Sequence, residues 1–214
     1  MPNIQIPEFP HERIVFFSDA VFAIAITLLI IEIKVPSHVV LHEIGVGGAL
    51  NKLIPLFTGF VVSFLVTGLF WKAHLIICQR IKHFDHKLLW INIFLLLFVA
   101  LMPFSTAFYS ENFNLNGSFI FYCLNLAAIG FFSFWMTAYS IKKENIASQV
   151  GSRYANWIKL RALISPLIFL LCIALTFLSP FLSRFSFILI FVFQSIGDRI
   201  YKKHAPATGA QSLT

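Results

Sequence analysis

Long apolar segments, broken by short polar ones, run along most of this chain. A helix that crosses a bilayer needs about 20 predominantly apolar residues, and six segments of the sequence meet this requirement. We therefore predict an all-α integral membrane protein, with six transmembrane helices in a domain over residues 1–204 and a disordered polar tail at 205–214. The predicted spans are 13–35, 53–77, 88–108, 119–141, 162–178 and 181–200.

The basic residues between these spans fall mostly on one side of the membrane. They follow the second and fourth spans and flank the first and last, whereas the opposite loops carry only Lys34, Lys52 and Arg184. Cytoplasmic loops of membrane proteins are enriched in Lys and Arg. The pattern therefore predicts a multi-pass protein with both termini in the cytoplasm, an orientation that requires an even number of spans.

Composition narrows the class further. Hydrophobic residues make up 58% of the chain and charged residues 12%, against about 45–50% and about 25% in a soluble domain, so we expect no soluble domain. The net charge of +7 comes from residues between apolar segments, which favours membrane topology over nucleic-acid binding. The sequence has no HExxH motif, nucleophile elbow or Cys/His ligand spacing, so we expect no enzyme, cofactor or structural metal.

The first seven residues lack the basic segment of a signal peptide, and we expect the first span to be retained.

The first predicted span carries two different faces. At about 100° per residue, Ile24, Leu28 and Ile31 fall within about 60° of one another, and Phe17 and Val35 lie on the same apolar stripe. Thr27 flanks the stripe, whereas Ser18 and Asp19 lie roughly 120–140° away from it. The stripe is either a packing seam or lipid contact, or a hydrophobic constriction of the kind that gates a pore by dewetting.

Asp19 is an ionisable group at membrane depth, where a charge costs a few kcal/mol even on lenient insertion scales. Its side chain could cap the start of a helix or bind a partner on another helix. Trp71 and His74 share one face of the second span, and Asn92 follows in the third. In the predicted orientation all of these residues lie in the cytoplasmic half of the membrane, which favours an interhelical polar cluster.

The same residues resemble the transmembrane protein 175 potassium-channel family, in its prokaryotic single-repeat branch. The matching motifs are Arg13-x-x-x-Phe17-Ser18-Asp19, Trp71-x-x-His74, and Leu89-Trp-Ile-Asn92 leading to Leu101-Met-Pro103. They cover the first three spans closely, whereas the last three match in hydropathy only. The resemblance implies a homotetrameric, potassium-preferring leak channel in a prokaryotic cell membrane, with membrane lipid and permeant K⁺ as its partners.

The resemblance also implies a role for individual residues. The first helix would line the pore, with Ile24 at its narrowest point, Leu28 and Ile31 further along, and Thr27 as a hydroxyl that bears on potassium selectivity. A structural polar network would hold this helix in place. The residues that match this network are Arg13, Phe17, Ser18, Asp19, Trp71, His74 and Asn92.

The sequence contains no Thr-Val-Gly-Tyr-Gly loop, so the backbone-carbonyl filter of ordinary potassium channels is absent. We expect selectivity to come from side chains and a narrow dehydrating constriction. A proton-coupled or small-solute transporter that uses Asp19 and His74 as a relay is the alternative, and a purely structural membrane protein is a further one. The position of Asp19 away from the apolar stripe argues against the transporter.

Overall fold

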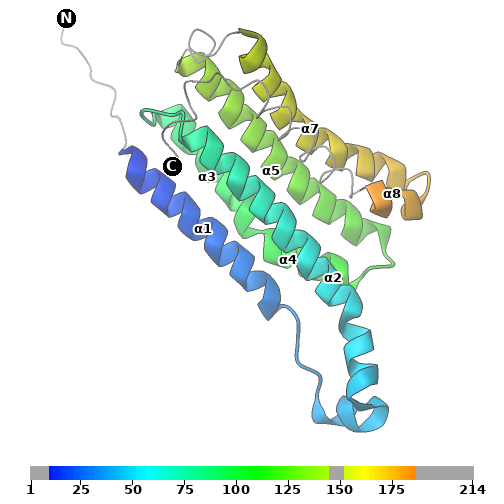
Figure 1. The fold of residues 1–214 in the computed structure, drawn as a ribbon. Coiled ribbons are helices and arrows are strands. Elements are labelled where there is room, and N and C mark those ends of the chain that lie inside the picture. The colour runs from blue at the N-terminus through cyan, green and yellow to red at the C-terminus, as the bar shows by residue number, and fades with distance from the viewer. Residues whose placement is uncertain (1–9, 145–151, 187–214) are drawn as a thin grey trace, which may run out of the picture.

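The computed structural model describes residues 10–144 and 152–186, and these ranges form a bundle of long helices (Figure 1). No strand occurs in these two ranges, which confirms the all-α prediction. The helices are α1 (His11–Ile31), α2 (His38–Cys78), α3 (His86–Ala100), α4 (Met102–Glu111), α5 (Asn116–Lys143), α7 (Ser152–Thr176) and α8 (Pro180–Ser186).

Five helical segments are long and apolar enough to cross a membrane. They are His11–Ile31, His38–Cys78, His86–Glu111, Asn116–Lys143 and Ala155–Thr176. The predicted sixth span, 181–200, begins in α8 and otherwise lies outside the described residues, as does the predicted tail at 205–214. The described part of the chain is thus a multi-pass helical membrane domain.

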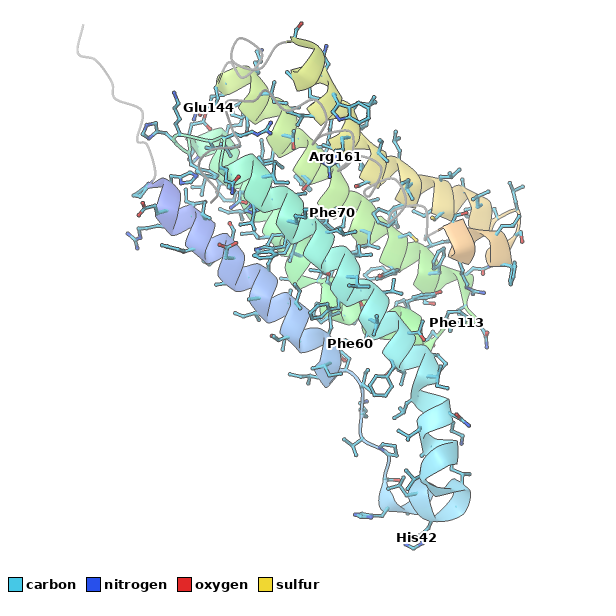
Figure 2. The ribbon with its side chains drawn as sticks, viewed as in Figure 1. His42, Phe60, Phe70, Phe113, Glu144 and Arg161 are labelled. Carbon is cyan, nitrogen blue, oxygen red and sulfur yellow. The ribbon has the colours of Figure 1, made fainter. Side chains whose placement is uncertain are left out.

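The first two helices differ in length from the predicted spans. α1 ends at Ile31, four residues before the predicted end at 35, whereas α2 starts at His38, well before the predicted start at 53. The Ser37 side chain accepts a hydrogen bond from the Val40 N–H (3.4 Å) and so starts α2 in a stretch that hydropathy reads as a loop. This first part of α2, kinked at Gly45 (φ 69°), carries His42 beyond the rest of the bundle (Figure 2).

The predicted third span is built from two helices. α3 ends at Ala100 and α4 begins at Met102, with Pro103 in its first turn. Proline has no N–H to donate and is tolerated in the first turn of a helix, where that donor has no partner in any case. Leu101 between them keeps right-handed helical angles, and its N–H and C=O bond to Leu97 and Ser105. The two helices therefore form one continuous apolar segment.

Small residues let the helices approach closely. A Cβ atom on Gly130 of α5 would lie 2.9 Å from Cδ of Pro166 in α7, and one on Gly59 of α2 would collide with the Ser110 hydroxyl of α4. Close packing over small residues is a main source of helix association in membranes. Fully buried side chains of α3 and α4, including Leu88, Leu95 and Met102, fill the interior.

α1 lies at one edge of the bundle (Figure 1). It packs against α2, α3 and α4, and the part of its circumference that these helices do not cover stays exposed. The bundle therefore presents one side of α1 outward.

Candidate functional site

The inner face of α1 is defined by four buried residues. Ser18, Phe22, Ala25 and Leu29 are buried, and their spacing of three or four places puts them on one face. Phe22 and Ala25 belong to the main core of the bundle, where Phe22 packs beside the His74 ring with 5.5 Å between ring centroids. This face attaches α1 to its own chain.

The opposite face of α1 carries the apolar stripe. The exposed fractions of Phe17, Ile24, Leu28 and Ile31 are 60%, 58%, 40% and 69%. Thr27 is also exposed, and its hydroxyl donates to the carbonyls of Ala23 (3.0 Å) and Ile24 (2.9 Å) in the same helix. The four apolar side chains and Thr27 thus face away from the rest of the described chain.

A buried hydrogen-bonded chain connects α1 to α2 and α3. The Ser18 hydroxyl donates to the Ile14 carbonyl (2.8 Å), the Asn92 side-chain N–H donates to Ser18 Oγ (2.9 Å), and His74 Nε2 lies 2.8 Å from Asn92 Oδ1. Ser18, His74 and Asn92 are each at most 1% exposed. Every buried polar atom along this chain therefore has a partner, as a low-dielectric interior requires.

The bonds of Asn92 indicate how His74 is held. Because the Asn92 amide nitrogen points to Ser18, its oxygen must accept, so His74 Nε2 carries the hydrogen. The other ring nitrogen, Nδ1, faces Cys78 Sγ at 3.6 Å. His74 acts here as a structural hydrogen-bond donor.

Asp19 binds Trp71 across the α1–α2 interface. The indole N–H of Trp71 donates to Asp19 Oδ1 at 2.9 Å. Asp19 is half-buried and Trp71 is 39% exposed, so this bond lies at the edge of the interface. α1 begins at His11, two turns before Asp19, which excludes the helix-start cap that the sequence had left open.

Arg13 and Phe17 stand apart from the other members of the predicted network. Both side chains are exposed. Within residues 10–144 and 152–186, neither forms a hydrogen bond, ion pair or ring contact. The structure thus joins Ser18, His74 and Asn92 in one chain and Asp19 and Trp71 in a separate pair, and it adds neither Arg13 nor Phe17 to them.

Sequence reasoning missed a second buried cluster, formed by hydroxyl groups of α2, α4 and α5. Ser63 Oγ accepts a hydrogen bond from Thr106 (2.9 Å) and lies 2.8 Å from the Tyr122 hydroxyl. Asn125 of α5 donates to Ser105 of α4 at 3.0 Å. Isolated Ser and Thr residues are common in membrane helices, so no motif marks these positions. The only signal in the sequence was the presence of hydroxyl-bearing residues within three different apolar spans.

A second missed site ties the α2–α3 connection to the end of α5. Asp85 Oδ1 accepts the Leu88 N–H (2.8 Å), which caps α3, and Oδ2 accepts the Tyr139 hydroxyl (2.7 Å). Lys143 Nζ lies 3.4 Å from the same Oδ2 and donates to the His83 carbonyl at 2.6 Å. Desolvation alone would raise the pKa of Asp85, but the donors from Tyr139, Leu88 and Lys143 outweigh it and lower this pKa below its ordinary 3.8.

No cluster of three or more His, Cys, Asp or Glu side chains that could hold a metal ion occurs in the part of the chain that the structure describes. Cys78, Cys123 and Cys172 are buried and free. The notable feature of the described residues is a helix, α1, with one face held by polar bonds and the other face apolar and exposed.

Comparison with known proteins finds a family that part of the chain resembles. Residues 13–103 match the family described as "Endosomal/lysosomal potassium channel TMEM175". This segment contains α1 from Arg13 on, all of α2 and α3, and the start of α4, and with them the polar chain and the apolar stripe.

Individual relatives match to different extents. A potassium channel of Chamaesiphon minutus is 41% identical over 99 residues, which cover 46% of this chain and 49% of that protein. The mouse endosomal/lysosomal proton channel TMEM175 is 31% identical over 193 residues, 82% of this chain and 37% of that protein. The match therefore spans about half the length of the first relative and less of the second.

A solved structure matches over a larger share. The crystal structure of a lysosomal potassium-selective channel TMEM175 homolog from Chamaesiphon minutus superposes with a TM-score of 0.78 at 29% identity. The superposition covers 87% of this chain and 97% of the other. The likeness of fold thus extends past residue 103 into the later helices.

Proposed function

We propose that the chain is a member of the TMEM175 family, which residues 13–103 match, and that it is a potassium-preferring, leak-type cation channel. The observation that carries the proposal is the division of α1 into two faces. Its inner face is held by buried packing and the Ser18–Asn92–His74 hydrogen bonds, while its outer face presents an apolar stripe that no described part of the chain covers.

In the proposed channel four copies of the chain assemble, and α1 of each copy faces a central axis. Ile24 forms the narrowest ring, and Leu28 and Ile31 extend the apolar constriction along the same face. Water leaves a narrow apolar passage readily, so such a ring acts as a gate by dewetting. Thr27 supplies a hydroxyl beside this ring and contributes to the preference for potassium.

The polar residues of α1 support this pore from behind. Ser18 and Asp19 fasten α1 to Asn92 and Trp71, at positions away from the stripe. Interhelical hydrogen bonds of this kind contribute about 0.6 kcal/mol each on average. The network therefore sets the position of α1 more than it sets total stability.

The proposed location is the cell membrane of a prokaryote, with both termini in the cytoplasm. The start of α1, the α2–α3 connection and the end of α5 meet at one end of the bundle (Figure 1). Contacts between His11 and Cys78 and between Asp85 and Tyr139 join these segments. Lys82, Lys142 and Lys143 lie at this end, which supports its assignment to the cytoplasm.

A proton-coupled transporter that uses Asp19 and His74 is the alternative, and the name of the mouse relative gives it some weight. Against it, His74 is fully buried and its Nε2 is already bonded to Asn92. Asp19 is occupied by Trp71. A relay would have to break both bonds in order to move a proton.

Ion flux into liposomes that contain only this protein tests the proposal. Potassium or sodium is supplied as the sole permeant cation, with and without a proton gradient. We expect passive flux that favours potassium and continues without the gradient. Flux that needs a proton gradient and saturates at low substrate concentration would reject the channel in favour of the transporter.

The substitution Ile24→Asn tests the position of the constriction. A polar ring should stay wet, so we expect higher flux and a weaker preference for potassium over sodium. Ile30→Asn is the matched control, because Ile30 is similarly exposed (44%) on the same helix but lies about 120° from Ile24. Equal effects of the two substitutions, or no effect of Ile24→Asn, would remove Ile24 from the ion path.

A further inference from the structure

A groove between α3 and α5 has no part in the proposed ion path. It is lined by Lys87, Trp90, Ile91, Phe94, Phe132 and Trp135. None of these residues belongs to α1. Trp90, Phe94 and Trp135 are 47%, 43% and 39% exposed, so large aromatic surfaces border the groove on the outside of a membrane-spanning bundle.

Stacked rings form one wall of this groove. Phe94 and Phe98 both stack on Phe132, each with 5.7 Å between ring centroids, and Phe132 stacks on Trp135 at 6.0 Å. Aromatic side chains have few rotatable bonds, and packing against one another limits them further. They offer a flat apolar surface that loses little entropy when an extended hydrocarbon chain lies against it.

The ammonium group of Lys87 lies at one end of the groove. Lys87 Nζ lies 5.0 Å from the centroid of the Tyr139 ring. Within the described ranges it has no carboxylate at ion-pair distance. Contact with an aromatic ring stabilises a cation but leaves its charge uncompensated. Arg80, Lys82, Lys142 and Lys143 lie at the same end of the bundle, together with the acids Asp85 and Glu144. The cations there outnumber the acids even without Lys87, so the net charge at this end favours anions.

A hydrogen-bond donor lies deeper in the groove. Trp135 precedes Tyr139 by four residues on α5, so it lies about one helical turn below the ring that Lys87 covers. The indole N–H of Trp135 has no hydrogen-bond partner among the described residues, whereas that of Trp90 donates to His86 Nε2 at 3.1 Å. Ammonium, N–H donor and stacked rings thus follow one another from the end of the bundle toward its middle.

This order matches the order of groups in a phospholipid, and we propose that the groove binds one anionic phospholipid. Lys87 pairs with the phosphate, Trp135 donates to an ester carbonyl, and an acyl chain lies against Phe94 and Phe132. The basic residues at this end favour a headgroup with net negative charge over a zwitterionic one. The proposal does not depend on the channel function and stands on the groove alone.

Fluorescence quenching by brominated lipids tests this site. The full chain is reconstituted in mixed vesicles of phosphatidylglycerol and phosphatidylcholine, with bromine on the acyl chains of one lipid at a time. The difference between the unmodified chain and Trp135→Phe isolates the signal of Trp135. We expect Trp135 to associate about fivefold more strongly with phosphatidylglycerol than with phosphatidylcholine, because the headgroup of phosphatidylglycerol has a net negative charge and one lysine near such a charge contributes about 1 kcal/mol.

Three variants make the test specific to the groove. Lys87→Gln should bring the ratio of the two association constants close to one, whereas Lys87→Arg should keep it. Lys142→Gln is the matched control, since it removes an exposed cation from the same end of the bundle but outside the groove lining. Retention of the ratio in Lys87→Arg shows that a loss in Lys87→Gln does not reflect misfolding.

Three outcomes would overturn the proposal. A ratio of one in the unmodified chain would mean that the groove does not select anionic lipid. Equal losses in Lys87→Gln and Lys142→Gln would assign the preference to diffuse surface charge. Absence of Trp135 quenching by either lipid would mean that another surface, such as a second copy of the chain, covers the groove.

Discussion

Substitution of Asn92 by alanine should loosen α1 without unfolding the bundle. Asn92 makes two buried bonds, one to Ser18 of α1 and one from His74 of α2. Interhelical bonds in membranes average about 0.6 kcal/mol each and reach about 1.7, so the loss of both costs about 1–3 kcal/mol. We therefore expect local opening of α1 to become about 5–150-fold more frequent, because this is the change in an equilibrium constant that 1–3 kcal/mol produces.

Hydrogen–deuterium exchange of the α1 amides, read by mass spectrometry in detergent, measures this opening directly. The peptide that contains residues 14–22 should exchange faster in Asn92→Ala, since it includes Ser18 and the Phe22 ring that packs on His74. Asn125→Ala is the matched control. Asn125 is also buried (4% exposed), but it joins α5 to α4 through Ser105.

The two variants should therefore differ in where they act. Asn125→Ala should speed exchange in α4 and α5 and leave α1 unchanged. If α1 exchanges at the original rate in Asn92→Ala, or equally fast in both variants, then the Ser18–Asn92–His74 chain does not hold α1 in place and the reasoning fails.

Two further substitutions test packing and electrostatics outside the pore. Gly130→Ala should destabilise the protein by roughly 1–3 kcal/mol, because the added methyl group meets the rigid backbone and ring of Pro166. Gly68→Ala is the control and should be neutral or stabilising in thermal unfolding, since no atom lies within 4 Å of its new Cβ. Similar shifts of the melting temperature in the two variants would contradict the close α5–α7 contact. The pKa of Asp85 is lower in the folded state than its ordinary 3.8. Its stabilising effect is therefore fully present above pH 3.8 and is lost as the pH falls through the lower, folded-state pKa. The melting-temperature difference between the original chain and Asp85→Asn should therefore shrink in acid, and a difference that does not change with pH would refute the role of its donors.

The sequence alone determined that this is a helical membrane protein and that α1 has one apolar face and one face with polar residues. Apolar runs of membrane-spanning length and a 3.6-residue period are local properties, so the helical fold and the stripe of Ile24, Leu28 and Ile31 follow from residues close together in the chain. The beginning of α2 did not follow, because a capping serine starts a helix where hydropathy falls, and a positive-φ glycine then kinks that helix into the apolar part of the span.

Only the tertiary structure decided which polar groups meet. Asn92 and Ser18 are 74 positions apart, and Tyr139 and Asp85 are 54 apart. In a membrane protein the surfaces that face lipid and the surfaces that face other helices are both apolar. Hydropathy therefore cannot tell one from the other, and isolated residues such as Ser63 or Thr106 carry no sign of their partners. The depth, rotation and spacing of whole helices fix those contacts, and these quantities depend on the packing of all the helices at once.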